Sequence, residues 1–386
     1  MAPFPRPPFP PGETRKMAWR ESLLNHLGPG LLGGITFGKW LRLLRDNRFA
    51  VAPSCVPRAM VITFQSVPTS LFHWNDQHKL RDQLKDVVVQ PPVFLLGHWR
   101  HGTTHLHYLM TIDRRFAFPN NYQTLFPNSF LTAESLHSRV IDFFLPNRRP
   151  MDNVEWTMGS PQEDEFALCV NCSRSPCTGW VFPKRRDYYD RYLTMRNVSD
   201  AEIAEWKEAF LLFLKKLTWL NNRPLILKSP PHTARIKLLL QMFPDARFVH
   251  IHRNPFDVFH SSRRMLKAVF ELHRLQRARL TDLDDWILRM YREMYESFFE
   301  ERRLIPAGQF HEMCFEELEQ DPVGQVRRIY EALNLPDFAH VHSRLQSYVD
   351  SIADYRKNAF PDLPSDVRQR ISREWQRSFE EWGYPA

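Results

Sequence analysis

The segment that most constrains the fold of this chain is an apolar run ending in a glycine, at residues 93–97. Residues 93–96 are typical of a buried strand, residues 97–102 of a tight turn, and residues 103–109 of the first turns of a helix. The first backbone N–H groups of a helix have no partner within the helix, and the helix dipole is positive at that end. Because an anion such as phosphate binds well there, the segment predicts a strand–loop–helix unit with an anion-binding loop.

Further apolar segments alternate with segments of helical periodicity along the chain. Strands are expected at residues 224–228, 247–252 and 309–315, and helices at residues 161–170, 201–218, 234–243, 256–270, 282–299 and 322–333. This alternation predicts an α/β fold with a P-loop-like parallel sheet flanked by helices, and additional helices at both ends of the chain. We expect Ser160 to cap the helix at 161–170, and Ser199 or Asp200 to cap the next one. Residues 117–130 are rich in aromatic residues and prolines, and are expected to form a loop.

The composition indicates one domain behind a short arm. The proline-rich residues 1–20 are expected to be disordered, and residues 21–386 to form a single domain with a core at roughly residues 90–335. No run of 18 apolar residues occurs, and the start lacks the pattern of a signal peptide. The five cysteines are expected to be free thiols, and the protein to be cytoplasmic.

Two apolar segments near the N-terminus leave alternatives open. Residues 37–44 fit an amphipathic helix packed on the core, or a helix on a membrane surface with Lys39, Arg42 and Arg45 at the interface. Residues 61–72 fit a buried helix or part of a substrate entrance. The net charge of +8 suits an anionic substrate, and no nucleic-acid-binding motif occurs in the sequence. Peripheral membrane contact and the oligomeric state are left open.

The turn at residues 97–102 differs from the loop that usually binds ATP. Its two glycines have the spacing of that loop, but Thr103 stands where the lysine would be. Arg100, inside the turn, supplies the positive charge instead, and a histidine beside a phosphate explains His101 more simply than a metal site does. The residues expected to bind the anion are Gly97, Arg100, His101, Gly102, Thr103 and Thr104.

A second strand–loop–helix segment makes the prediction more specific. The expected strand at residues 247–252 leads into Arg253-Asn254-Pro255-Phe256-Asp257, and Ser261 follows on the next helix. Here the chain resembles the sulfotransferases that use 3′-phosphoadenosine 5′-phosphosulfate (PAPS), over roughly residues 90–335, and looks closest to a bacterial-type branch. The resemblance implies that the first loop binds the 5′-phosphosulfate, and that Arg253 and Ser261 bind the 3′-phosphate. It also implies that Lys228, at the end of an expected strand, contacts the transferred sulfuryl group.

The general base is not indicated by the resemblance, because this chain departs from the family patterns. The cytosolic branch has a histidine shortly after the lysine, where this chain has Pro230; His232 lies nearby but is shifted. Other branches have a glutamate after the phosphosulfate loop, where residues 119–122 hold no carboxylate. The best substitutes are Glu163 and Glu165, in a carboxylate cluster that opens an expected helix. A helix-capping role would account for Glu163, so Glu165 is favoured as the base, with Glu163 and His232 as alternatives.

The motifs and the resemblance together predict a PAPS-dependent sulfotransferase. PAPS would donate its sulfuryl group, without a metal, to the hydroxyl of a small acceptor that is lipid-like or aromatic. Lys357, in the segment Tyr355-Arg356-Lys357-Asn358, is expected on a loop that closes over the nucleotide near its 3′-phosphate. Two alternatives remain: a P-loop-type kinase, which would need a lysine after Gly102, and a non-catalytic nucleotide-binding protein.

Overall fold

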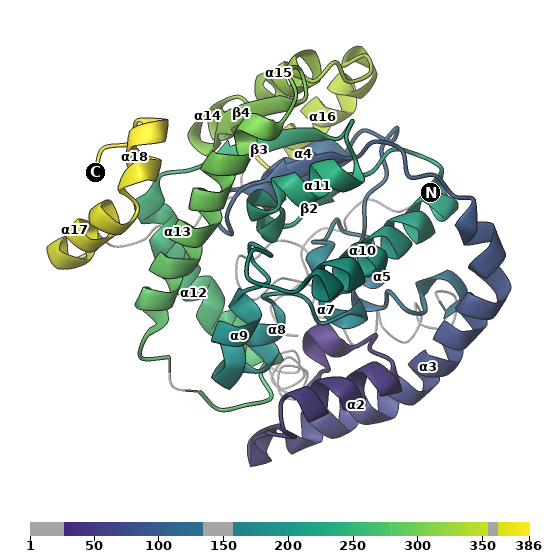
Figure 1. Ribbon diagram of the computed structural model, residues 1–386. Helices are drawn as coiled ribbons and strands as arrows, with labels where there is room; N and C mark the ends of the chain where they lie inside the picture. The colour runs from purple at the N-terminus through teal and green to yellow at the C-terminus, as the bar shows by residue number, and fades with distance from the viewer. Residues whose placement is uncertain (1–26, 134–156, 279, 354–361) are drawn as a thin grey trace, which may run out of the picture.

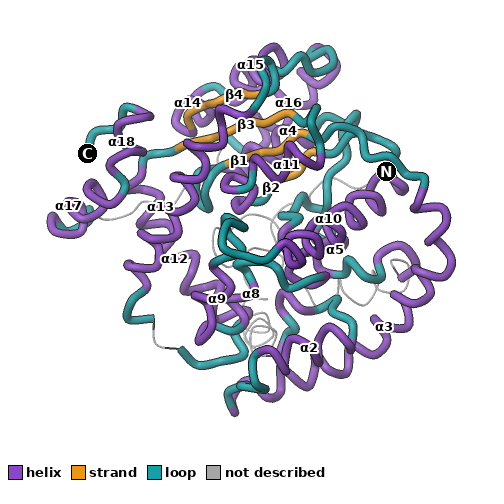
Figure 2. Tube along the Cα trace, in the orientation of Figure 1, coloured by secondary structure: helices purple, strands orange, loops and turns teal. Residues whose placement is uncertain are grey.

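The sheet at the centre of the molecule has four parallel strands. A computed structural model of the chain describes residues 27–133, 157–278, 280–353 and 362–386. Its strands are β1 (Val93–Leu96), β2 (Ile226–Lys228), β3 (Arg247–His252) and β4 (Phe310–Cys314), in the spatial order β2-β1-β3-β4 (Figures 1 and 2). Every neighbouring pair is parallel, so the predicted α/β fold is confirmed.

The helices of the described residues surround this sheet. They are α2 (Phe37–Asp46), α3 (Val56–Lys85), α4 (Thr103–Thr111), α5 (Asn121–Leu125), α7 (Glu165–Asn171), α8 (Thr178–Val181), α9 (Arg186–Asp190), α10 (Asp200–Asn221), α11 (Ile236–Met242), α12 (Pro255–His273), α13 (Leu283–Glu301), α14 (Phe315–Gln320), α15 (Pro322–Ala332), α16 (Ala339–Ser351), α17 (Ser365–Glu374) and α18 (Gln376–Trp382). None of them is long and apolar enough to cross a bilayer.

Alternate residues of the strands pack into two separate cores. Phe94 and Phe248 face the larger core, where their rings stack with centroids 5.5 Å apart and where α10 to α13 contribute. Leu95 and Val249 face the smaller core, which α4, α15 and α16 cover. Since both faces are buried, β1 consists of four apolar residues without polar alternation, as parallel sheets require.

The connections after β1 and β3 leave the sheet in opposite directions. α4, which follows β1, packs in the smaller core, whereas α12, which follows β3, packs in the larger one. β1 and β3 are neighbours, with Leu96 beside His250. The carboxyl ends of these two strands therefore form a topological switch point, and ligands of open α/β sheets bind at such a point.

Two local predictions differ from the structure. Residues 117–130 are not wholly a loop, because they contain α5, whose first turn is closed by a capping box between Asn120 and Gln123. The helix expected at residues 161–170 begins only at Glu165, and Ser160 does not cap it. The Ser160 hydroxyl accepts the backbone N–H of Thr157 instead. These boundaries depend on side-chain partners that lie elsewhere in the chain.

Other boundaries agree with the sequence or lie outside the described residues. Ser199, rather than Asp200, caps α10 through a capping box with Glu202. The helix expected at residues 234–243 is α11, which begins at Ile236, and a 3₁₀ turn, η4 (Pro230–Ala234), precedes it. Residues 1–20 and Lys357 belong to the undescribed segments.

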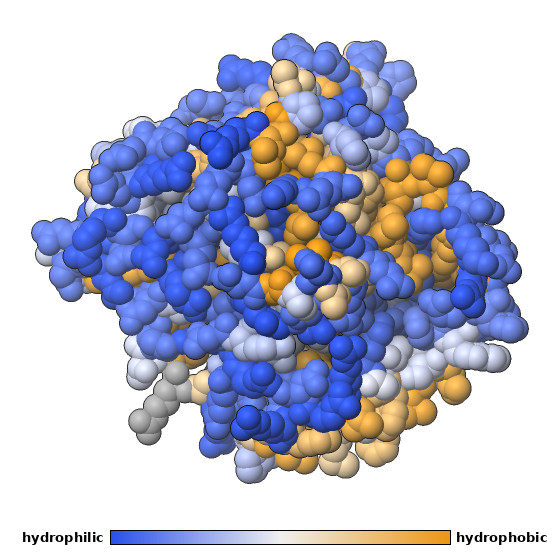
Figure 3. Space-filling model, in the orientation of Figure 1, coloured by the Kyte–Doolittle hydropathy of each residue, from blue (hydrophilic) through white to orange (hydrophobic). Residues whose placement is uncertain are grey.

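The apolar segments of the N-terminal region form two adjacent helices. Residues 37–44 lie in α2, which buries Trp40 and Leu43 against the larger core. Residues 61–72 lie within the 30-residue helix α3, which is only partly buried. Figure 3 shows apolar atoms along the lower edge of the molecule, where Figure 1 places α2 and α3.

Candidate active site

The loop after β1 is held in a tight conformation by two glycines. Gly97 has φ +145°, and a Cβ there would lie 2.7 Å from the Ile251 carbonyl oxygen. Gly102 has φ +87°, and a Cβ there would overlap the ring of Phe315. Arg100 has φ +75°, which is uncommon for a side-chain-bearing residue and marks a strained site. The loop thus brings its backbone close to the start of α4, as an anion site at a helix N-terminus requires.

The two predicted donor-binding motifs meet at the carboxyl ends of β1 and β3. The Nε of Arg100 donates to the Oγ of Ser261 on α12 over 2.7 Å. Arg253, which follows β3, donates from Nη1 to the Arg100 carbonyl over 3.4 Å. Its guanidinium also lies 4.6 Å from the ring centroid of Phe315 and 3.3 Å from the Asp257 carboxylate. The structure therefore brings together two cations and a hydroxyl whose positions in the sequence are far apart.

Three consecutive carboxylates lie at the carboxyl end of β2. Each contacts a different basic side chain of the segment 228–235: Glu163 with Lys228, Asp164 with His232, and Glu165 with Arg235. The three carboxylates differ in burial and in hydrogen-bond partners, and these differences decide which of them could act as a general base.

The pair of Glu165 and Arg235 is fully buried, and both carboxylate oxygens of Glu165 accept hydrogen bonds. Arg235 Nη1 donates to Glu165 Oε2 over 2.8 Å, and Nη2 donates to Oε1 over 3.1 Å. Both side chains are 0% exposed. The same guanidinium also donates to the backbone carbonyls of Tyr192 and Leu193. Because both carboxylate oxygens are occupied by a permanent cation, this geometry argues against the predicted role of Glu165 as general base.

The pair of Asp164 and His232 is also buried, in an aromatic surrounding. His232 Nε2 lies 2.6 Å from Asp164 Oδ2, and both side chains are 0% exposed. The imidazole packs against Phe94 and Phe210, with ring centroids 5.3 and 5.4 Å away. Burial alone would raise the pKa of Asp164, but His232 and a hydrogen bond with Ser229 outweigh it and lower the pKa. His232 is therefore anchored inside the core.

The pair of Lys228 and Glu163 is the most accessible of the three. Lys228 Nζ donates to Glu163 Oε1 over 2.7 Å, and Glu163 keeps 9% of its side chain exposed. In the described part of the chain, Glu163 Oε2 has no hydrogen-bond partner. Lys228 lies beside Leu95 in the sheet, so this pair sits two residues from the start of the loop at Gly97.

The predicted phosphate contact of His101 does not fit its position. The imidazole is 0% exposed and bonds through Nδ1 to the Ile251 carbonyl over 3.1 Å and to the Tyr295 hydroxyl over 3.0 Å. It stacks on Tyr295 and therefore supports the loop from inside the core. Thr103 and Thr104 begin α4, as predicted, with Thr103 4% exposed.

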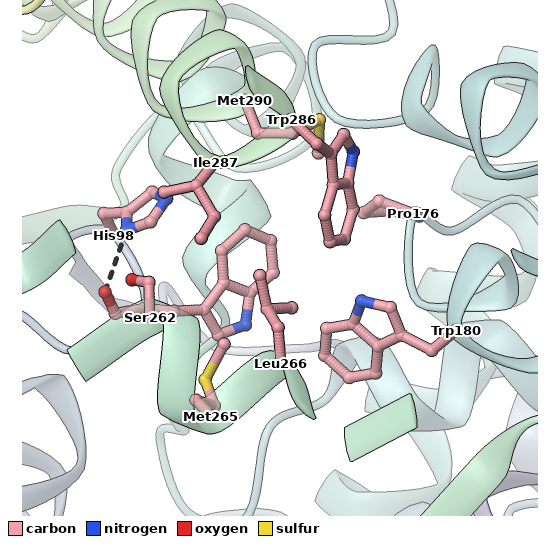
Figure 4. A pocket seen from close by; sticks show the side chains of 10 residues that line it. His98, Pro176, Trp180, Ser262, Met265, Leu266, Trp286, Ile287 and Met290 are labelled. Atoms are coloured by element: carbon pink, nitrogen blue, oxygen red, sulfur yellow. Dashed lines mark hydrogen bonds between the residues drawn. The ribbon is translucent and has the colours of Figure 1, made fainter. Parts of the chain in front are cut away.

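An apolar pocket lies beside the loop, between α8, α12 and α13. Figure 4 shows Trp180 and Trp286 facing Leu266 and Met265 across it, with His98 at one side. The cavity measures about 30 Å³, which is room for about one water molecule. An acceptor ring would need these side chains to move.

Sequence reasoning missed two residues that organise the site. Arg235 belongs to no recognisable motif. The sequence does hold a weak signal for a buried ion pair, because Arg235 follows an expected strand and turn while a cluster of acidic residues lies elsewhere in the chain. Phe315, the first residue of α14, also lies outside the motifs described above, but its ring lies against both Gly102 and Arg253. Its ring therefore links the two donor motifs.

Buried histidines next to the loop predict a loss of stability at mildly acidic pH. Burial lowers the pKa of His98 to about 4 and that of His107 to about 3, compared with an unfolded value near 6.5. The unfolded state therefore binds protons first, so stability is fully present above pH 6.5 and falls as the pH decreases. Each such histidine should cost about 1 kcal/mol between pH 6.5 and 5.5. Calorimetry should show this decrease, with a shallower slope for His98→Asn; equal slopes would contradict the assignment.

The geometry of the site is that of a known class of protein. A parallel sheet with a tight anion loop, a helix N-terminus and two arginines at its switch point is typical of proteins that bind a nucleotide by its phosphates. A sequence profile of the sulfotransferase family matches residues 91–340. The chain belongs to this family and is a sulfotransferase.

Relatives span nearly the whole chain. The chain is 36% identical, over 96% of its length and 94% of the relative, to the omega-hydroxy-beta-dihydromenaquinone-9 sulfotransferase Stf3 of Mycobacterium bovis, and equally to that of Mycobacterium tuberculosis. Among solved structures, sulfotransferase STF9 of Mycobacterium avium matches with a TM-score of 0.68 at 20% identity, covering 94% of this chain and 95% of that one. STF1 of Mycobacterium tuberculosis matches with a TM-score of 0.62 at 16% identity, covering 94% and 97%. These structures confirm the predicted fold.

Proposed function

We propose that this sulfotransferase uses PAPS as its donor and a lipid-like alcohol as its acceptor. The observation that carries the donor assignment is the meeting of Arg100, Arg253 and Ser261 at the switch point of the sheet. A nucleotide with phosphates at both the 5′ and the 3′ position needs two anion sites that are close together. The loop before α4 supplies the first site, and Arg253 with Ser261 supplies the second.

The transfer step follows from the side chains at the end of β2. The acceptor oxygen attacks the sulfur in line, the bond from sulfur to the bridging phosphate oxygen breaks, and adenosine 3′,5′-bisphosphate leaves with that electron pair. Glu163 receives the proton of the acceptor hydroxyl, and Lys228 stabilises the charge that develops on the sulfuryl and bridging oxygens. The 2.7 Å contact between Lys228 and Glu163 supports this pairing of base and cation.

The acceptor class is supported by the relatives. The relative that is 36% identical is named as a sulfotransferase of a hydroxylated menaquinone derivative. The small pocket near the loop is lined by aromatic side chains such as Trp180 and Trp286, and would admit an apolar acceptor once these side chains move. We therefore propose a hydroxylated isoprenoid or similar lipid for this chain.

Replacing Arg253 tests the donor assignment. Arg253→Ala should weaken adenosine 3′,5′-bisphosphate by roughly 10- to 100-fold, because a charged hydrogen bond is worth about 1.5–3 kcal/mol. Adenosine 5′-phosphosulfate, which lacks the 3′-phosphate, should lose much less. Titration calorimetry with both ligands measures the difference. Lys267→Ala removes an exposed cation from the same helix as a control. Equal losses for both ligands in Arg253→Ala would refute the assignment.

A further inference from the structure

One side of α3 exposes an unbroken row of apolar side chains. Its members follow one another at intervals of four and three residues, which places them on one face of the helix. They are Val56, Met60, Phe64, Val67, Leu71 and Trp74. Three of them expose about two thirds of their surface: Phe64 at 70%, Trp74 at 67% and Leu71 at 66%. Large exposed apolar surfaces of this kind mark interaction sites.

The neighbouring helix α2 extends the same surface. The backbone N–H of Phe37 donates to Ser70 Oγ over 2.8 Å, and Trp40 Nε1 donates to Thr63 Oγ1 over 2.8 Å. The two helices therefore run antiparallel and side by side, as Figure 1 shows. Phe37 and Leu41 of α2 are 42% and 47% exposed. We call these two residues and the row on α3 the α2–α3 face; Figure 3 shows apolar atoms along this edge.

Charged residues are absent from the middle of this face and lie towards its two ends. Residues 59–75 contain no Asp, Glu, Lys or Arg, which corresponds to a helix length of about 25 Å. Basic residues surround the chain that joins α2 to α3: Arg45, Arg48, Lys184, Arg185 and Arg277. The acidic residues nearby are Asp46, which pairs with Arg45 over 3.7 Å, and Asp187. This end of the α2–α3 face is thus net positive.

We propose that the α2–α3 face docks onto the surface of a bilayer that contains anionic lipids. An apolar face beside a basic cluster is the arrangement by which interfacial helices bind such membranes. The bilayer would be the phase that holds a lipid-like acceptor, so the benefit of docking rests on the proposed function, whereas the docking itself stands on the surface.

A second copy of the chain is a less suitable occupant. A parallel pairing of two α3 helices would place the basic cluster of one copy against that of the other. An antiparallel pairing would place it against the far end of α3, where the exposed Lys79, Arg81 and Lys85 outnumber the exposed Asp82 and Asp86. Both arrangements bring like charges together, whereas anionic lipid head groups complement them.

Vesicle flotation of the full chain tests this inference. The protein should float with vesicles of phosphatidylcholine and phosphatidylglycerol, and more weakly with phosphatidylcholine alone. The double variant Phe64→Glu/Leu71→Glu should bind the anionic vesicles at least tenfold more weakly. Leu304→Glu is the matched control, since it places the same charge on an apolar residue 48% exposed outside the α2–α3 face. Arg45→Glu/Arg48→Glu should lose the preference for phosphatidylglycerol.

Two further measurements separate the other outcomes. Thermal unfolding and adenosine 3′,5′-bisphosphate binding of Phe64→Glu/Leu71→Glu should match the unmodified chain, because the exposed face is remote from the donor loops. Wild-type binding to adenosine 3′,5′-bisphosphate without any flotation would overturn the docking proposal and leave the proposed function intact. A dimer in light scattering that the double variant abolishes, in a chain that does not float, would assign the face to a second copy instead.

Discussion

Glu163→Gln should lower the turnover of sulfuryl transfer by roughly 10²- to 10⁴-fold, the usual effect of losing a general base. The amide keeps the shape of the side chain and can still accept a hydrogen bond from Lys228, so adenosine 3′,5′-bisphosphate should bind with nearly unchanged affinity. Single-turnover kinetics under saturating donor measures the chemical step. The reason to expect the effect here is that Glu163 Oε1 contacts Lys228 while Oε2 has no partner among the described residues.

His232→Asn is the variant that distinguishes the remaining alternative. His232 is anchored to Asp164 and packed between two phenylalanines, so its replacement should reduce stability more than turnover per folded molecule. If Glu163→Gln keeps near-normal turnover while folded His232→Asn loses it, then His232 is the base and the assignment of Glu163 is wrong.

Glu165→Gln should destabilise the fold by about 3–5 kcal/mol, because removing one partner of a buried ion pair leaves the other charge uncompensated. Arg235 would remain 0% exposed with only neutral acceptors, namely the new amide oxygen and the backbone carbonyls of Tyr192 and Leu193. Denaturant unfolding monitored by tryptophan fluorescence measures the change. Glu205→Gln provides the matched control: Glu205 pairs with Arg174 over 2.8 Å but is 32% exposed, so its loss should cost about 1 kcal/mol or less.

Activity separates a structural role of Glu165 from a catalytic one. The folded fraction of Glu165→Gln should transfer the sulfuryl group at a rate close to that of the unmodified chain. Unchanged stability together with a large loss of turnover would restore Glu165 as the candidate base, as its place in the sequence first suggested.

The parts of the molecule that short segments determine could be predicted from the sequence. β1 and β3 have the predicted bounds, because apolar runs followed by glycine or by Arg-Asn-Pro leave few alternatives. The meeting of the two donor motifs also follows from local sequence, once parallel strands bring their carboxyl ends to one edge. The glycines of the loop are needed where backbone or an aromatic ring approaches closely, as at Gly102.

The parts that depend on contacts between distant residues could not be predicted. Nothing near Glu163, Asp164 or Glu165 indicates which basic residue each would contact, since their partners come more than 60 residues later. Glu163 pairs with Lys228 and does not cap α7, which begins at Glu165. The partners of the two glutamates therefore favour Glu163 over Glu165 as the base.

Direct transfer from PAPS tests the central claim most sharply. The purified chain, in detergent micelles that hold a hydroxylated isoprenoid quinone, should convert PAPS and the lipid into adenosine 3′,5′-bisphosphate and a sulfated lipid in equal amounts, and EDTA should not stop it. Chromatography with mass spectrometry measures both products. If PAPS stays intact while ATP with Mg²⁺ is consumed, or if adenosine 3′,5′-bisphosphate binds without any transfer to hydroxylated lipids or small alcohols, the account is contradicted.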